Sequence, residues 1–214
     1  MKAILTTLLL LIGTMAFSQF TVTSRYFNNN SEGIDLNFET DNTLNQGFEL
    51  DLGYWFRLKN KRLEFIPEVG YSLYSGATET TASGFNVNLN VLIYPLDFHN
   101  DCNSCPTFSK EGGTIKKGFH WIITPGWSNF NLSNPDDLVI ASQPVGASEI
   151  STFRIGAGAG LDIGVTNLLA LTPFVMFNIG EEYEYFGIGD VVIQRYRQLH
   201  FGLRATLRLD KDKW

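Results

Sequence analysis

The sequence predicts an all-β fold: a closed, antiparallel transmembrane β-barrel of eight strands in up-and-down, or meander, order. Three observations predict it. Apolar and polar residues alternate with a period of two along most of the chain, which is the spacing of β-strands. Several alternating runs reach about ten residues or more, the length a tilted strand needs to cross a bilayer. Aromatic residues gather near the ends of these runs, as they do at membrane interfaces.

The beginning of the chain has the layout of a secretory signal peptide. Lys2 precedes an apolar run at residues 3–12, and small residues end the segment just before Gln19. The apolar run is too short to span a bilayer as a helix, and no cysteine follows it to carry a lipid. We expect residues 1–18 to be a cleaved signal peptide and residues 19–214 to form one exported barrel domain.

Composition narrows the classes of protein that fit. The chain has 17 Phe, 8 Tyr and 4 Trp, and only 18% of its residues are charged, which argues against disorder. Its formal net charge of −6 gives no basic surface for nucleic acid. We therefore expect no nucleic-acid partner, and the sequence indicates no cofactor.

Seven strands follow from the alternation. In the run 47–58, apolar residues from Phe48 to Leu58 fall on one face and charged residues such as Glu49 fall on the other. A polar turn then leads into a second alternating run, so the two runs predict a hairpin. The seven runs are 47–58, 63–73, 84–96, 119–132, 153–165, 169–179 and 199–209.

The eighth strand has two candidates. Residues 20–27 and residues 34–39 both alternate, but only one of them fits an even-stranded closed barrel, and we prefer 20–27. Within the run 119–132 the apolar pattern changes phase at Phe130 and Leu132. We interpret this phase change as a β-bulge near the barrel rim.

The connections provide a further test, because bacterial barrels have short periplasmic turns and longer extracellular loops. If the first strand runs outward, the turns at Asn60 and Asn167 are periplasmic. The long segment 97–118 is an exception, since it also falls on the periplasmic side, and the sequence does not say whether it binds a periplasmic partner. The segments expected outside lie around Asn30, Thr80, Asp137 and Gly189.

Alternation also fits a secreted soluble β-sandwich, whose apolar face forms a core. Strand length, the aromatic strand ends and the glycine-rich polar faces favour lipid outside and a narrow interior instead. Tyr74 and Tyr94 contribute to these aromatic ends. The residues that we expect at the membrane interfaces are Tyr54, Tyr71, Trp121, Trp127, Tyr183 and Tyr185.

With this pattern, nearly the whole mature chain resembles the small outer-membrane β-barrel superfamily, the eight-stranded proteins that include the OmpA transmembrane domain. The resemblance implies a place in the Gram-negative cell envelope, with outer-membrane lipid and lipopolysaccharide as surroundings. It also implies recognition by the barrel-assembly machinery, which reads a last strand with a terminal aromatic. Here Leu203, Leu207 and Leu209 lead to Trp214, although the charged residues 210–213 depart from the pattern.

Ionisable residues lie at inward positions of several strands. Eight strands leave an interior just wide enough for side chains, so we expect these residues to pair into a plug rather than line a pore. A proton or small-ion path along them is the alternative. The residues are Glu49, Asp51, Arg57, Glu64, Glu68, Arg154, Asp162, His200, Arg204 and Arg208.

A lipid-modifying enzyme would need a base near a serine and a carboxylate at the extracellular rim. His99 and His120 belong to the periplasmic side, and His200 points inward, so we expect no catalytic residues. Two cysteines are too few for a structural zinc site, and we expect no metal. In an oxidising compartment, Cys102 and Cys105 are expected to form a local disulfide.

An acidic and aromatic segment follows the sixth predicted run and forms a rim on the outside. It fits a solvated loop better than a divalent-ion site that bridges to lipopolysaccharide phosphates, since its carboxylates lack ligand spacing. Its acidic residues are Glu181, Glu182, Glu184 and Asp190. We expect a non-catalytic barrel whose extracellular loops have structural, binding or adhesion roles. A lipid-modifying enzyme, a minor conduit and a secreted soluble β-sandwich remain alternatives, and the sequence indicates no particular ligand.

Overall fold

The structure of the chain is a computed structural model. Among the residues that it describes, no helix is long and apolar enough to cross a membrane. The described residues are 19–28, 46–58, 62–75, 81–96, 115, 118–133, 139–140, 143–144, 149–166, 168–186 and 191–208.

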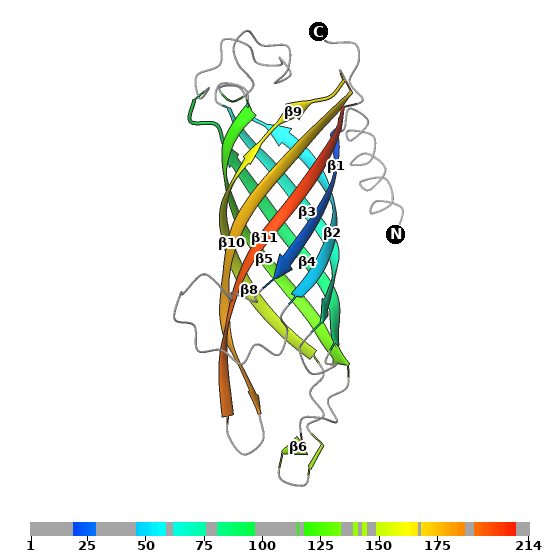
Figure 1. Ribbon diagram of the computed structural model, residues 1–214, viewed down its shortest axis with the longest axis vertical. Coiled ribbons are helices and arrows are strands. Elements are labelled where there is room, and N and C mark those ends of the chain that lie inside the picture. Colours follow the sequence, from blue (N-terminus) through cyan, green and yellow to red (C-terminus); the bar gives the residue numbers. More distant parts are fainter. Residues whose placement is uncertain are drawn as a thin grey trace, which may run out of the picture.

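Within these residues, eight antiparallel strands close into a barrel, which confirms the predicted fold class (Figure 1). Each strand pairs with its neighbour along the chain, and the last strand pairs with the first, so the barrel has no open edge. The barrel strands are β1 (Gln19–Asn28), β2 (Gln46–Arg57), β3 (Leu63–Ser75), β4 (Thr81–Ile93), β5 (Phe119–Ser133), β8 (Glu149–Leu161), β10 (Leu169–Phe186) and β11 (Val191–Arg208).

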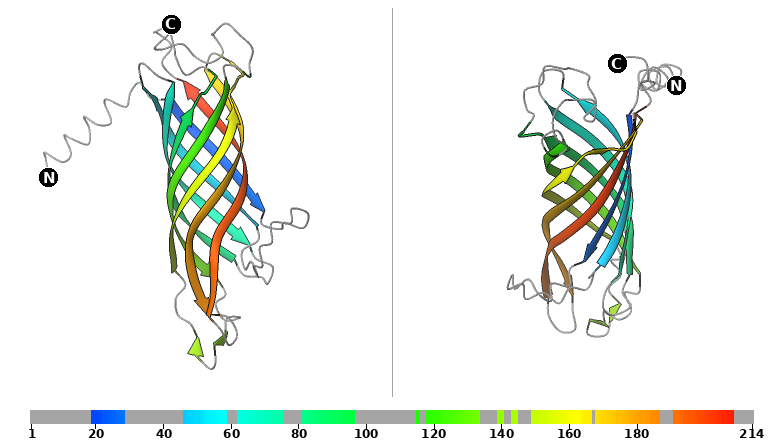
Figure 2. Two further views of the ribbon diagram at one scale, coloured as in Figure 1. Left: turned by 90° about the vertical axis from the view of Figure 1, so that its left-hand side faces the viewer. Right: turned by 45° about the horizontal axis from the view of Figure 1, so that its top comes forward.

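Three two-residue strands are present in addition to the barrel strands. β6 (Val139–Ile140) pairs with β7 (Gln143–Pro144), and β9 (Ile163–Gly164) pairs with β10 just beyond the end of β8. Figure 2 shows that the barrel strands are tilted against the barrel axis, as closure requires. Below, the proximal end is the rim where β1 begins, at the top of Figure 1, and the distal end is the rim where β1 ends.

The choice of the first strand is confirmed: β1 covers the preferred segment and closes the barrel against β11. The alternative, residues 34–39, lies outside the described residues. β10 and β11 are longer than their predicted runs because their hairpin pairing continues past the point where the apolar alternation stops. A register shift between Ile179 and Glu182 marks that point.

The bulge predicted at Phe130 is wrong. β5 keeps one register with β4 and with β8 through this position, where Phe130 pairs with Gly84 on one side and Ile150 on the other. Phe130 is an inward-facing aromatic, 2% exposed, whose ring centroid lies 5.4 Å from that of Tyr74. An apolar residue on the inward face, and not an inserted residue, therefore causes the apparent change of phase.

The barrel is inverted relative to a soluble protein. Phe85 is 69% exposed on the outer surface, and Leu52 and Val69 are each 61% exposed. Glu49 and Asp51, by contrast, are completely buried inside. A continuous apolar exterior around a charged interior matches a barrel surrounded by lipid and is the reverse of a β-sandwich core.

Candidate functional site

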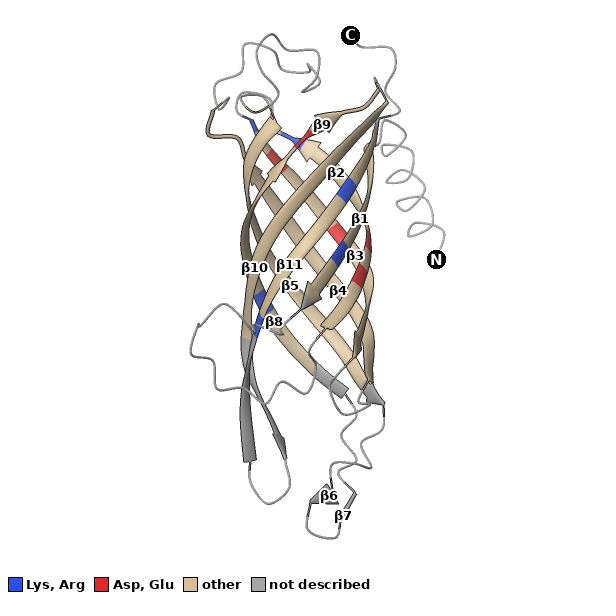
Figure 3. Cartoon of the chain, in the orientation of Figure 1, with Lys and Arg blue, Asp and Glu red and all other residues tan. Residues whose placement is uncertain are grey.

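Charged residues occupy only scattered positions along the barrel strands (Figure 3), and most of those that the structure describes are buried in the interior. Inward positions recur at every second residue of a strand, so side chains from different strands meet there. They form a central network around Arg25, a proximal cluster on Glu64 and Asp162, and a distal aromatic plug around Phe27.

The central network is organised around Arg25 of β1, which is 1% exposed. Its Nη1 donates hydrogen bonds to Glu49 at 2.5 Å and to Asp51, and its Nη2 donates to Glu68. One guanidinium group thus holds carboxylates from β2 and β3. Buried carboxylates that meet one cation in this way are stable only together, because each charge compensates the desolvation of another.

Glu49 extends the network to the opposite wall of the barrel. Arg154 of β8 donates from Nη2 to the two carboxylate oxygens of Glu49 at 2.9 and 3.0 Å. The side-chain amides of Asn86 and Asn88 donate to Glu49 Oε1 at 3.0 and 3.1 Å. Together with Arg25 of β1, charged and neutral donors from β4 and β8 therefore satisfy this one buried carboxylate.

Glu68 brings a third arginine into the network. Thr23 Oγ1 donates to Glu68 Oε1 at 2.6 Å, and Arg204 Nε lies 3.6 Å from the same oxygen. The guanidinium carbon of Arg204 lies 5.4 Å from the ring centroid of Phe174. The formal charges of the central network balance, with Arg25, Arg154 and Arg204 opposite Glu49, Asp51 and Glu68.

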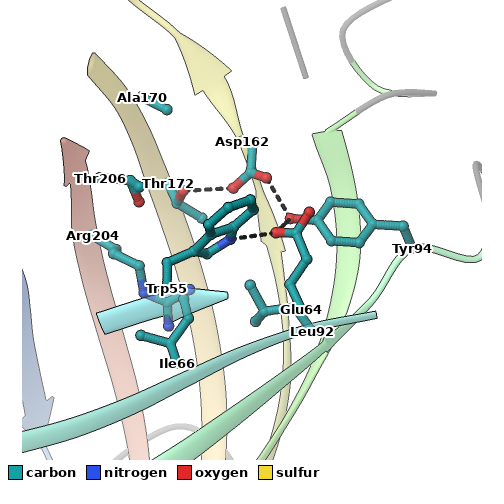
Figure 4. Close-up of a pocket in the computed structure, with 10 residues that line it drawn as sticks. All are labelled: Trp55, Glu64, Ile66, Leu92, Tyr94, Asp162, Ala170, Thr172, Arg204 and Thr206. Carbon is teal, nitrogen blue, oxygen red and sulfur yellow. Dashed lines mark hydrogen bonds between the residues drawn. The ribbon is translucent and has the colours of Figure 1, made fainter. Parts of the chain in front are cut away.

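The proximal cluster is built on Glu64 and Asp162 (Figure 4). The Tyr94 hydroxyl lies between them, 2.8 Å from Glu64 Oε2 and 2.6 Å from Asp162 Oδ2. Trp55 Nε1 donates to Glu64 Oε2 at 2.7 Å, and Thr172 Oγ1 donates to Asp162 Oδ1 at 2.6 Å. A single phenol group therefore connects a carboxylate of β3 with one at the end of β8.

Basic side chains surround the same cluster. Arg62 Nε lies 3.6 Å from Glu64 Oε1, and its guanidinium carbon lies 3.8 Å from the ring centroid of Tyr94. Arg57 Nη1 lies 3.8 Å from Glu64 Oε1, and His120 Nδ1 lies 3.9 Å from Asp162 Oδ1. The two arginines balance the two carboxylates in formal charge, as in the central network.

The distal aromatic plug fills the other end of the interior. Phe27 is completely buried, and its ring centroid lies 5.1 Å from those of both Tyr74 and His200. Tyr74 in turn packs on Phe130, and Ala82 completes this apolar cluster. The interior is thus polar at its centre and aromatic toward its distal end.

A small cavity lies between the central network and the proximal cluster (Figure 4). Glu64, Asp162 and Tyr94 line it together with Arg204 and Thr206. Its volume of about 10 Å³ is close to what one water molecule needs. The described part of the chain contains no group of three or more His, Cys, Asp or Glu residues that could hold a metal ion.

The ionisable residues that the sequence predicts in the interior lie in different parts of the structure. His200 lies in the distal end beside Phe27, and its Nε2 is 3.0 Å from Gln198 Oε1. The side chain of Arg208 lies outside the described part of the structure. The central network brings together Glu49, Asp51, Glu68, Arg154 and Arg204, and the proximal cluster brings together Arg57, Glu64 and Asp162.

Sequence reasoning missed Arg25, Arg62 and Tyr94. Arg25 shares the inward parity of Thr23 in β1, and this parity could have identified it. Arg62 falls in a predicted turn, and nothing in its pattern indicates burial. Tyr94 follows β4 on the inward side, where it is completely buried, so its interpretation as part of an interface girdle is wrong, as is that of Tyr74.

The remaining aromatics that were predicted for the interfaces divide into two groups. Tyr71, Trp121 and Trp127 are 42%, 50% and 42% exposed on the outer surface, and Tyr54 is partly exposed. Their interfacial role stays a prediction. The second group, Tyr183 and Tyr185, has side chains that lie outside the described part of the structure. The same is true of the side chains of Glu181, Glu182, Glu184 and Asp190, and of the residues Cys102, Cys105 and Trp214.

Comparison with known proteins gives a likeness of fold only. No family model and no curated protein matches the chain. Neisserial surface protein A is 12% identical, with a TM-score of 0.47 over 90% of this chain and 96% of that chain. Ail, the attachment invasion locus protein of Yersinia pestis, is 12% identical, with a TM-score of 0.40 over 90% and 97%. The chain therefore forms a closed eight-stranded antiparallel barrel that is apolar outside and charged inside.

Proposed function

We propose that the protein is a non-catalytic integral outer-membrane barrel, exported with a cleaved signal peptide, whose extracellular connections have structural, binding or adhesion roles. The observation that carries this proposal is the inverted barrel: an outer surface that only lipid solvates well, around an interior occupied by its own paired charges. Because side chains fill the interior, the connections between the strands are the parts of the chain that can contact other molecules.

The interior supports a plug rather than a channel. Arg25 and Arg154 tie β1 and β8 to Glu49 across the lumen, and the distal aromatic plug follows toward the next rim. An ion that crossed would have to displace paired charges and then pass packed rings. We expect no steady conductance from purified protein in planar bilayers, and sustained single-channel currents would contradict the plug.

The place in the cell is tested by sarkosyl fractionation of cells that express the full chain, followed by a heat-modifiability gel. We expect recovery in the outer membrane and an unboiled band with a different mobility from the boiled band. Mass spectrometry of the recovered protein should show a chain that begins at Gln19. A periplasmic protein whose mobility ignores boiling would overturn the proposal.

A further inference from the structure

We propose that the interior cavity is a specific binding site for one water molecule, which bridges Arg204 of the central network to the carboxylates of the proximal cluster. This inference goes beyond the proposed function, because it concerns how two separate charge clusters are joined inside the barrel. It rests on a buried cation with unused donors, on the polarity of the cavity and on its charge balance.

The first observation concerns Arg204, which is 1% exposed. Its Nε interacts with Thr23 Oγ1 at 3.4 Å and with Glu68 Oε1 at 3.6 Å. Its Nη1 and Nη2 are buried, and no acceptor among the described residues takes a hydrogen bond from them. A buried guanidinium with unpaired donors is costly, so a partner in the adjoining cavity would stabilise the barrel.

The second observation concerns what the rest of the cavity offers. Glu64 and Asp162 also line it, and a carboxylate accepts more hydrogen bonds than Tyr94, Trp55 and Thr172 supply to them. A ligand that accepts from the guanidinium and donates to a carboxylate satisfies both sides. Water does so. Ile66, Leu92 and Ala170 also line the cavity, but its charged and hydroxyl groups distinguish it from the purely apolar cavities that stay dry.

Charge excludes the other small ligands. The central network and the proximal cluster are each formally neutral, so an anion at Arg204 would bring a net negative charge beside Glu64 and Asp162. A cation would lie against the guanidinium group of Arg204. A neutral molecule of the size that the cavity admits avoids both repulsions.

The experiment measures magnetisation transfer from water to alanine methyl groups in the folded full chain, with ¹³C-methyl-labelled alanine in lipid nanodiscs. Ala170 lines the cavity and is 4% exposed, while Ala82 is equally buried, at 2%, but lies in the distal aromatic plug. We expect transfer at Ala170 and none at Ala82. Absence of transfer at Ala170, or equal transfer at both methyl groups, would overturn the proposal.

A variant distinguishes bound water from exchanging hydroxyl protons of nearby threonines. Arg204→Met removes the guanidinium donors, so the signal at Ala170 should be lost; a signal that persists unchanged would contradict the bridge. The comparison of Ala170 with Ala82 needs no variant and stands if Arg204→Met does not fold. In crystals soaked in bromide, anomalous scattering in the cavity would show an anion there and would likewise overturn the water site.

Discussion

Arg25 and Glu68 form a buried ion pair inside the barrel although strand β2 separates their strands in the sheet. The same guanidinium contacts Glu49 and Asp51. We predict that Arg25→Met lowers the free energy of unfolding by about 3–5 kcal/mol, since it leaves buried carboxylates without their shared cation. Urea titration of protein folded in detergent micelles measures this loss. Arg57→Gln, at the proximal rim, is the control and should cost less; equal losses would contradict the central role of Arg25.

On the outer surface, introducing a charge should destabilise the barrel, whereas in the interior removing one does. Phe85, the fifth of the 13 residues of β4, has a large apolar side chain that is 69% exposed. Phe85→Arg should lower the stability of the barrel in lipid vesicles by about 2–4 kcal/mol if it lies near the bilayer midplane, whereas Phe85→Leu should have little effect. Reversible unfolding in vesicles provides the measurement. An arginine that is tolerated as well as leucine would mean that this face meets water.

Truncation in the distal aromatic plug tests its packing. Phe130→Ala removes a ring that is 2% exposed and packs on Tyr74, and a cavity remains because the barrel wall cannot collapse. We expect a loss of about 3–5 kcal/mol in the free energy of unfolding. Phe153→Ala is the control, because its side chain is 49% exposed and lipid can fill the space. Equal losses in the free energy of unfolding for the two variants would show that the distal aromatic plug is not part of the packed core.

Glycine at position 158 allows close approach between two strands. A Cβ atom built there would lie 2.2 Å from the carbonyl oxygen of Val175 and 2.7 Å from Cα of Met176, and this backbone cannot move aside. Gly158→Val should therefore prevent formation of the heat-modifiable band. Ala157→Val, at the neighbouring position with an outward side chain, should fold. A folded Gly158→Val variant would show that β10 can shift away from β8.

The sequence predicts the barrel well and its interior only in part. A period of two marks every barrel strand, because one face must meet lipid and the other must not, and Phe48 and Glu49 illustrate the two faces. Periodicity fails where the interior is itself apolar, as at Phe130, since an inward aromatic then looks like a shift of phase. Which charges meet depends on strand order and register, so the pairing of Glu49 with Arg154, 105 positions away, could not be inferred from alternation.

The long sequence separation between Glu49 and Arg154 affects how the barrel is expected to insert into the bilayer. Glu49 meets its partners only when β1, β2 and β8 stand in their places around a completed cylinder. A half-rolled sheet would present these groups to hydrocarbon without compensation, at a cost of several kcal/mol for each ion. We therefore expect insertion and closure to occur as one cooperative event. In a membrane, unpaired backbone groups at an open sheet edge and unpaired interior charges are both costly, so both favour an all-or-none transition.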